Sequence, residues 1–393
     1  MLSVAQTIRT ILDSINTHPE VETRPLTAVL GRLLATDVSS TIAVPPADNS
    51  AMDGYALNTG DNHGEPLPIS QTIAAGTPPS PLAPGTAARI YTGAEIPVGA
   101  NAVVMQEDCT VDNTAVTVPA HIEPQQNIRA KGQDIEAGAR ILERGRALQP
   151  QDLGLLASVG IAEVAVYRPI KVAILSTGDE LVTPPTPLQA GQIYNSNRFL
   201  LHGLLAKLGV EVIDIGVVED TLAATCEALT HAAKADCIIS TGGVSVGDRD
   251  YIKEAVAQLG SVDLWRIALK PGKPLAFGRV QDTPFFGLPG NPSSVFITFL
   301  LFARPYLIAL QGGTVTPPVS VSLPTTFSWQ ANPVREEYVR VKINEQQQLE
   351  CYPNQSSGVL SSASWANGLA VIPPKTSIAI GDQVTVIPLS EWV

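Results

Sequence analysis

The chain has few of the residues that build metal or disulfide frameworks. Its four cysteines in 393 residues lie far apart and form no CxxC pair: Cys109, Cys226, Cys237 and Cys351. This spacing argues against zinc and disulfide frameworks and fits a reducing cytoplasm. Basic residues are also scarce, since 25 Lys and Arg against 37 Asp and Glu give a formal net charge of −12. We therefore expect no broad binding to nucleic acid, because no basic surplus can neutralise its phosphates.

Long apolar segments and common catalytic motifs are missing too. The longest apolar run, from Val295 to Ala303, contains Thr298 and is too short to span a bilayer, so it predicts a core helix and no membrane partner. The N-terminus lacks a basic stretch followed by an apolar core, which argues against a secretory signal. The chain has no GxxxxGK[ST] run, no complete GxGxxG and no histidine beside a GxSxG elbow.

What is present indicates a well-packed protein of several domains. Hydrophobic residues make up 45% and charged residues 16%, and 393 residues are too many for one core. Helical apolar spacing covers residues 4–15 and 26–34, and short β-rich runs follow at 87–91, 102–106 and 115–118. Over about 168–312, strands expected at 170–175, 210–218, 237–240 and 264–269 alternate with helices expected at 197–208, at 222–234 and after Tyr251. This alternation predicts a parallel, doubly wound sheet. From residue 317 the strands are short and helical patterns vanish, which favours a terminal β-barrel or sandwich.

A glycine-rich loop between a strand and a helix is the most informative segment. The apolar strand 237–239 leads into Gly242, Gly243 and Gly247, and a helical pattern begins at Tyr251. Such a loop lets backbone N–H groups reach an anion. It also carries Ser245, Asp248 and Asp250. Two carboxylates beside a phosphate site repel the anion unless a divalent cation lies between them, so the loop predicts a site for phosphate plus metal.

Carboxylates follow the other predicted strands of this sheet as well. Ligands of open α/β sheets bind at the carboxyl ends of parallel strands. The residues placed at that edge are Asp179, Glu180, Asp220, Asp248 and Asp250. Each alone is explained better by a turn or a helix cap than by a functional role. Together they favour a functional site.

Two further segments suit an anion. Lys270 and Lys273 bracket a Pro-Gly turn and can hold phosphate as point charges, although a solvated turn explains the run about as well. Asn291 and Pro292 have the residue types of a helix start, where free N–H groups attract anions, although simple capping explains them too.

Seven runs spread in order along the chain resemble the molybdopterin molybdenumtransferase family, which includes the bacterial MoeA proteins and the E domain of gephyrin. The runs are DNSAMDGYA (48–56), YTGAEIP (91–97), NIRAKGQDI (127–135), LSTGDEL (175–181), STGGVSVGDRDY (240–251), ALKPGKPLAFG (268–278) and FGLPGNPSS (286–294). The chemistry of the first three alone leaves turns and sites undecided; the order of all seven carries the resemblance.

The resemblance implies a multidomain α/β and β fold. Residues 1–41 and 133–167 would form an elongated discontinuous α+β domain, with a β-rich domain inserted at 42–132. Residues 168–312 would form the central doubly wound α/β domain, which resembles molybdopterin adenylyltransferases, and residues 313–393 a C-terminal β-barrel. It also implies a homodimer in which the β insertion of one subunit completes the cleft of the other.

The implied reaction inserts molybdate into adenylylated molybdopterin and releases AMP, with Mg²⁺ as the divalent cation. The implied protein partners are molybdopterin adenylyltransferase and the enzymes that receive the cofactor. The residues implied in catalysis are Asp53, Thr92, Asp134, Glu180, Asp220, Asp250 and Lys270, and the metal ligands among them are Glu180, Asp220 and Asp250. Those implied in cofactor binding are Arg129, Gly242, Gly243, Ser245, Gly247, Lys273, Pro289, Asn291, Pro292, Ser293, Arg335 and Ser357.

Two positions of the chain differ from the family pattern or compete for one role in it. Arg266 stands where the family often has lysine, and Asp248 competes with Asp250 for the metal, although the motif favours Asp250.

Two other functions stay open. The α/β segment alone fits a molybdopterin adenylyltransferase almost as well, but the β insertion and the terminal barrel argue against it. A non-enzymatic scaffold like the gephyrin E domain is less favoured, because the chain has no long linker or low-complexity tail.

Overall fold

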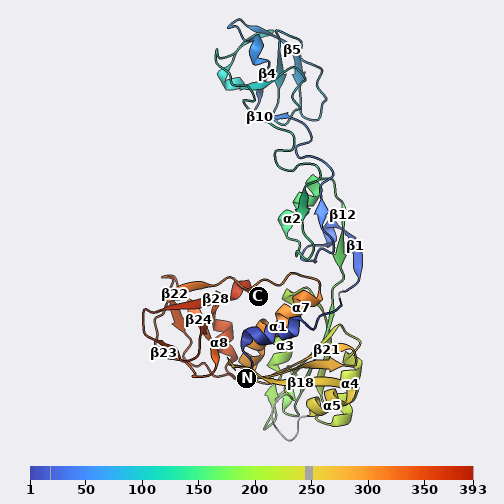
Figure 1. The fold of residues 1–393 in the computed structure, drawn as a ribbon, viewed down its shortest axis with the longest axis vertical. Coiled ribbons are helices and arrows are strands. Elements are labelled where there is room, and N and C mark those ends of the chain that lie inside the picture. Colours follow the sequence, from blue (N-terminus) through green and yellow to red (C-terminus); the bar gives the residue numbers. More distant parts are fainter. Residues whose placement is uncertain (18, 244–250, 393) are drawn as a thin grey trace.

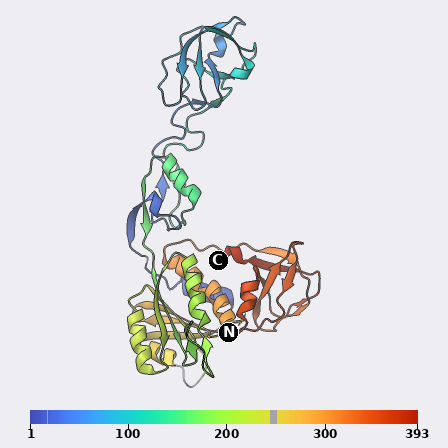
Figure 2. The same ribbon diagram turned by 180° about the vertical axis from the view of Figure 1, so that it is seen from behind.

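A computed structural model describes residues 1–17, 19–243 and 251–392. The molecule is elongated: a β-rich unit stands apart at one end, and an α/β unit and a β-barrel lie side by side at the other (Figure 1). A slender stem built from two separate chain segments joins the two ends, as the reverse view also shows (Figure 2). The chain runs through the stem to the far end and back before it enters the α/β unit.

The distal unit, from β3 to β10, is built on one mixed sheet in the order β7-β4-β6-β5-β9-β8. The strands of this sheet are β4 (Gly54–Leu57), β5 (Leu67–Ile73), β6 (Ala87–Ile90), β7 (Ala102–Met105), β8 (Thr110–Asp112) and β9 (Ala115–Thr117). At its base β3 (Asn49–Ser50) pairs with β10 (Ile128–Arg129). The β-rich runs expected at 87–91, 102–106 and 115–118 are confirmed as β6, β7 and β9.

The stem pairs strands that are far apart in sequence. β1 (Val21–Pro25) runs antiparallel to β12 (Glu163–Tyr167), and β2 (Val38–Ser39) to β11 (Arg140–Leu142), while α2 (Pro150–Ser158) covers them. The helix expected over 26–34 is wrong. Only a 3₁₀ turn, η1 (Leu26–Ala28), forms there, because Gly31 adopts φ +77° and Leu33 and Leu34 form extended bridges to Ala147 and Val166.

The α/β unit contains the expected central sheet, in the order β16-β13-β17-β21-β20-β18. β16 (Glu211–Val218), β13 (Lys171–Thr177), β17 (Cys237–Thr241) and β21 (Thr283–Leu288) are parallel, as the sequence predicted. β20 (Pro274–Val280) departs from that prediction because it runs antiparallel to β21 and to β18 (Gly260–Arg266). A short connection between β20 and β21 forces this, since a parallel crossover needs a dozen or more residues.

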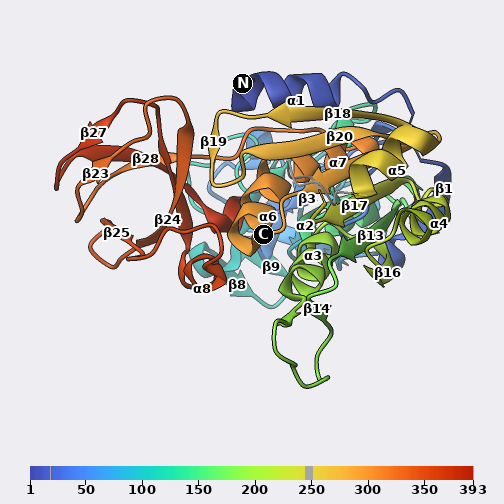
Figure 3. The same cartoon turned by 90° about the horizontal axis from the view of Figure 1, so that it is seen from below.

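Helices cover both faces of this sheet, which makes it doubly wound. The α4 (Leu222–Ala232) and α5 (Tyr251–Leu259) helices pack on one face. On the other face lie α3 (Ser196–Lys207) and a long helix made of α6 (Pro292–Thr298), a π-helical turn η4 (Phe299–Ala303) and α7 (Arg304–Leu310). The α1 helix (Val4–Leu12) packs against η4 and α7, whereas the family resemblance implies that residues 1–41 belong with 133–167. Figure 3 shows α1 alongside β18 and β20.

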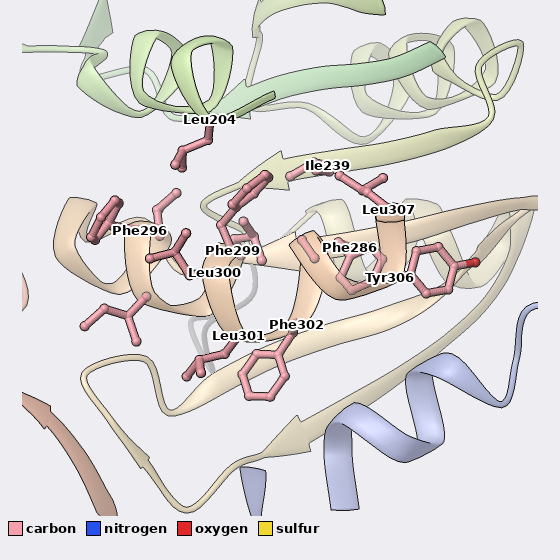
Figure 4. Packing of buried hydrophobic residues seen from close by; sticks show 14 of the residues in the cluster. Leu204, Ile239, Phe286, Phe296, Phe299, Leu300, Leu301, Phe302, Tyr306 and Leu307 are labelled. Carbon is pink, nitrogen blue, oxygen red and sulfur yellow. The ribbon is translucent and has the colours of Figure 1, made fainter. Parts of the chain in front are cut away.

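The long helix is the core helix that the sequence predicted. Of the part of the chain that the structure describes, Pro292–Leu310 is the one helix long and apolar enough to cross a membrane, but 83% of its apolar window is buried inside the protein. Its side chains pack between α3, β17, β21 and α1 (Figure 4). Burial of this kind is typical of a core helix.

The barrel unit begins after residue 313 and borrows one strand from earlier in the chain. Its sheet order is β19-β24-β26-β28-β22, with β25 (Leu349–Cys351) paired to β24. The strands are β19 (Leu269–Lys270), β22 (Val321–Pro324), β24 (Glu336–Ile343), β26 (Gly368–Ile372) and β28 (Gln383–Pro388), and β23 (Trp329–Gln330) pairs with β27 (Ser377–Ile378). The sequence predicted one strand over 264–269 and no helix in this unit. Instead the strand splits into β18 and β19, and α8 (Leu360–Trp365) packs against α6.

Candidate active site

A cavity of about 710 Å³ lies between the α/β unit and the barrel unit. Loops at the ends of three strands, the turn after β19, the start of α6 and a barrel loop line it. The polar and charged lining residues are Thr177, Glu180, Asn197, Thr241, Lys270, Lys273, Asn291, Ser294, Arg335, Gln355, Ser356 and Ser357. Of the residues implied in binding or catalysis, Gly242, Gly243 and Pro289 also line it.

The cavity is at the carboxyl ends of β13, β17 and β21, the edge that the sequence predicted. These three strands are neighbours, with Ser176 beside Thr241 and Thr241 beside Leu288. The buried hydroxyls of Ser176 and Thr241 lie 3.0 Å apart and fix two of the strand ends relative to each other. Thr177, Thr241 and Pro289 therefore reach the cavity from adjacent strands.

Two glycines give the wall of the cavity its shape. Gly242 has φ +86° and Gly243 has φ +66°, a region that side chains rarely adopt. A Cβ at Gly243 would lie 2.6 Å from Cγ1 of Ile252, which is buried in α5. Both glycines are thus required where the chain leaves β17. Ser245, Gly247, Asp248 and Asp250, expected in the same loop, lie outside the described residues.

We expect Gly243→Ala to lower the free energy of unfolding by about 2 kcal/mol, because left-handed backbone costs a side chain about 1–2 kcal/mol and Ile252 must also move. Urea unfolding measures this. Gly203→Ala is the matched control: Gly203 is an exposed position in α3 with open space around its Cα, so alanine there should stabilise by about 0.5–1 kcal/mol. Equal changes in stability for the two substitutions would contradict the left-handed, closely packed geometry of Gly243.

Three cationic side chains face the cavity from two units. Lys270 ends β19, Lys273 lies in the turn that follows it, and Arg335 comes from the segment before β24. The Lys270 ammonium is 2.9 Å from Oε1 of Glu337, a carboxylate whose side chain is 2% exposed. Lysine and arginine together with neutral hydroxyl and amide donors suit an oxyanion ligand.

The start of α6 contacts the barrel. Asn291 occupies the cap position and Pro292 the first turn, as predicted, but the Asn291 side chain donates to Oγ of Ser357 (3.1 Å). The Ser293 amide donates to the Ser357 carbonyl (2.9 Å), and its hydroxyl donates to the Val359 carbonyl (2.8 Å). Ser293 is therefore occupied with the barrel loop, and Ser294 lines the cavity in its place.

A buried arginine, which the sequence did not single out, holds that barrel loop. The Arg340 side chain is 1% exposed and donates to the Ser356 carbonyl (3.1 Å) and to Oγ of Ser362 (3.0 Å). Burial lowers the pKa of Arg340 to about 10. Its backbone amide also donates to Oε1 of Gln355 (3.0 Å), which belongs to the same loop. The loop of Gln355, Ser356 and Ser357 is thus fixed against the cavity.

Two of the three proposed metal ligands belong to the described residues. Glu180 lines the cavity, and Asp220 follows the neighbouring strand β16, where its amide donates to Oδ1 of Asp179 at 3.4 Å. Within residues 1–17, 19–243 and 251–392, no group of three or more His, Cys, Asp or Glu side chains gathers at a metal-binding distance. The third proposed ligand, Asp250, lies outside these ranges.

The remaining predicted residues belong to the distal unit and its junction with the stem, far from the cavity of the same chain (Figure 1). Asp53 and Thr92 lie together: Oδ1 of Asp53 accepts from the Thr92 amide (2.7 Å) and hydroxyl (2.8 Å). Arg129 is exposed in β10, and Asp134 is exposed with its amide bound to the Val44 carbonyl. The chain therefore carries its predicted residues in two separate places.

We expect Thr92→Val to raise the pKa of Asp53. Two hydrogen bonds from Thr92, first from its amide and then from its hydroxyl, hold that pKa below its usual range, and valine removes the second. A lowered pKa stabilises the fold above the unfolded-state value, and this contribution is lost as the pH falls through the folded-state value. NMR titration of the Asp53 carboxyl measures the change. Thr110→Val, at an exposed position in β8, should leave it unaltered.

Comparison with known families covers most of the chain. Residues 2–160 match the MoeA N-terminal region (domain I and II), residues 173–309 match a probable molybdopterin binding domain, and residues 322–389 match the MoeA C-terminal region (domain IV). The three matches follow one another in the order in which the structure places the distal unit and stem, the α/β unit and the barrel.

The similarity to known proteins covers almost the whole chain. A molybdopterin molybdenumtransferase of Haemophilus influenzae is 40% identical, with 99% of each chain covered, and one of a Nostoc species is 37% identical over 98% of this chain and 92% of the relative. The crystal structure of a molybdopterin biosynthesis MoeA protein from Pyrococcus horikoshii has a TM-score of 0.84 at 31% identity, with 99% of both chains covered.

Proposed function

Because the chain belongs to the molybdopterin molybdenumtransferase family, we propose that it inserts molybdate into adenylylated molybdopterin and releases AMP. It is a transferase of molybdenum cofactor biosynthesis.

The cavity between the α/β unit and the barrel carries this proposal. Three cations, Lys270, Lys273 and Arg335, face hydroxyl and amide donors and the carboxylate of Glu180 across about 710 Å³. Such a site can hold a substrate with a phosphate-linked nucleotide and a second, separate oxyanion. Positive charge placed where negative charge develops is the largest catalytic contribution that a rigid site supplies.

The two sides of the cavity suit the two substrates. On the α/β side the glycines after β17 leave room for phosphate groups close to the backbone, and Lys270 and Lys273 supply charge. On the barrel side Arg335 and Ser357 offer a fork of N–H donors and a hydroxyl to a small tetrahedral dianion such as molybdate. Holding both in one cavity brings the reacting groups together, which lowers the entropic barrier.

Mg²⁺ is a proposed cofactor, and the described carboxylates fit it. Mg²⁺ usually binds one or two carboxylates together with substrate phosphates. Glu180 in the cavity and Asp220 at the neighbouring strand end would hold it, and the sequence adds Asp250. When bound, the ion would neutralise the charge that develops as a pyrophosphate bond breaks.

A homodimer is also proposed. Asp53, Thr92 and Arg129 lie in the distal unit, separated from this chain's own cavity by the stem. A partner subunit's distal unit is the natural source of these side chains at the cavity. Molybdopterin adenylyltransferase and cofactor-receiving enzymes are proposed partners in the same pathway, and the four free cysteines fit a reducing cytoplasm.

The direct test supplies the purified chain with adenylylated molybdopterin, Mg²⁺ and molybdate, and measures released AMP. We expect release that depends on molybdate and falls when Mg²⁺ is chelated. Release that is the same without molybdate would overturn the proposal. Incubation with ATP and unadenylylated molybdopterin tests the adenylyltransferase alternative, which predicts pyrophosphate release.

A further inference from the structure

A buried carboxylate lies directly behind one of the cavity lysines. Glu337 is in β24 of the barrel, and the parallel pairing of β19 with β24 places Lys270 opposite it. Its Oε1 is 2.9 Å from the Lys270 ammonium. The lysine ends β19, after which the chain returns to β20 of the α/β sheet, so this ion pair lies where the chain passes from the barrel sheet to the α/β unit.

The Glu337 carboxylate is held in place by barrel groups other than the lysine. Its Oε2 accepts from the indole N–H of Trp329 at 2.6 Å, and its Oε1 accepts from the Asn332 amide at 3.2 Å. The side chain is 2% exposed, whereas that of Lys270 is 42% exposed. The ammonium also lies 5.8 Å from the centre of the Trp329 ring. The carboxylate is thus a fixed point, and the lysine is the member of the pair that faces the cavity.

We infer that Glu337 is a positioning residue: it holds the ammonium of Lys270 in one place for the reaction that the cavity performs. A lysine has a long, flexible side chain, and a free one spreads its charge over many rotamers. Anchoring by a fixed carboxylate removes that freedom before the substrate binds. This inference rests on the proposed function for its rate measurements.

Glu337→Gln tests it because glutamine keeps the shape of the side chain and an acceptor for Trp329 but loses the charge. We expect kcat for molybdate-dependent AMP release to fall about tenfold, the change that a barrier higher by ~1.4 kcal/mol produces. The Kd of AMP, measured by calorimetry, should stay within about twofold of the original or become tighter, because the cavity gains one unit of positive charge. An unchanged kcat, or a weaker Kd together with a lower Tm, would overturn the inference.

Glu336→Gln is the matched control. Glu336 is the preceding residue of β24, and its Oε1 accepts from the Tyr338 hydroxyl at 2.9 Å. It loses the same charge without touching Lys270, so its kcat should match that of the original protein.

A double-mutant cycle with Lys270→Met shows whether Glu337 acts through the lysine. If it does, Glu337→Gln causes no further loss of kcat once Lys270 is methionine. An equal tenfold loss in both backgrounds would assign Glu337 another role.

The acetylation rate of Lys270 does not depend on turnover, so it tests this inference separately from the proposed function. Peptide-resolved acetylation by acetic anhydride, with Lys273 as the internal reference, should be several-fold faster at Lys270 in Glu337→Gln, because the paired ammonium is released. If the original protein releases no AMP with molybdate, the proposed function fails while acetylation still decides the role of Glu337. Unchanged acetylation of Lys270 would overturn the positioning role.

Discussion

Phe302→Ala is expected to lower the free energy of unfolding by about 3–5 kcal/mol, the range found when a buried phenylalanine is truncated. Phe302 is 0% exposed and lies in the π-helical turn η4, inside the long helix Pro292–Leu310 (Figure 4). The helix α1 packs against this turn, so the substitution leaves a cavity at the junction of two helices.

Urea unfolding followed by tryptophan fluorescence measures this loss. Phe199→Ala in α3 is the control, since Phe199 is 53% exposed and its truncation should change stability by about 0.5 kcal/mol or less. A loss at Phe302 no larger than that at Phe199 would contradict the placement of this helix in the core. The substitution should also disturb the cavity, because the cap residue of the same helix, Asn291, lines its wall.

The α/β unit was predictable because its signals are local. Each of its strands is a short apolar run that ends in polar residues, and each helix has apolar spacing and a clear end. The strands over 170–175, 210–218 and 237–240 and the helices over 197–208 and 222–234 are confirmed with shifts of a residue or two. Their carboxyl ends form the cavity edge for the same reason, since parallel strands point their ends the same way.

The errors occur where contacts distant in sequence decide the structure. The 26–34 segment has helical spacing, but its apolar side chains, among them Val29 and Leu34, pack into the stem core from turns and bridges to residues 147 and 166. Likewise β19 leaves the α/β sheet to pair with β24, about 70 residues later. Propensity is a weak guide where a partner strand is that distant.

The site was predictable in its α/β half and less so in its barrel half. Lys270, Lys273 and Asn291 stand out beside prolines and glycines, and the structure places all three at the cavity. Glu337 and Arg340 carry no such local signature, because each is one polar residue within a strand. Only their burial, at 2% and 1% exposed, and their partners reveal what they do: Glu337 pairs with Lys270, and Arg340 donates to the Ser356 carbonyl.

Lys273→Met is expected to lower kcat/KM for molybdate-dependent AMP release roughly 10- to 100-fold. Lys273 is an exposed cation at the cavity, on the turn that its own carbonyl fixes by accepting from the Ile267 amide at 2.9 Å. A hydrogen bond to a charged group contributes about 1.5–3 kcal/mol, which corresponds to that range. Methionine keeps the length of the side chain and the turn, so the Tm should stay the same.

Two control variants and a salt titration distinguish the loss of an ionic contact at Lys273 from a general disturbance of the fold. Lys273→Arg keeps the charge and should retain most of the activity, whereas Lys375→Met, at an exposed barrel loop away from the cavity, should retain all of it. Because an exposed charge is screened by ions, added salt should weaken AMP binding more in the original protein than in Lys273→Met. Equal salt dependence in both would mean that Lys273 makes no ionic contact with the substrate, and the phosphate side of the cavity would then rest on Lys270 alone.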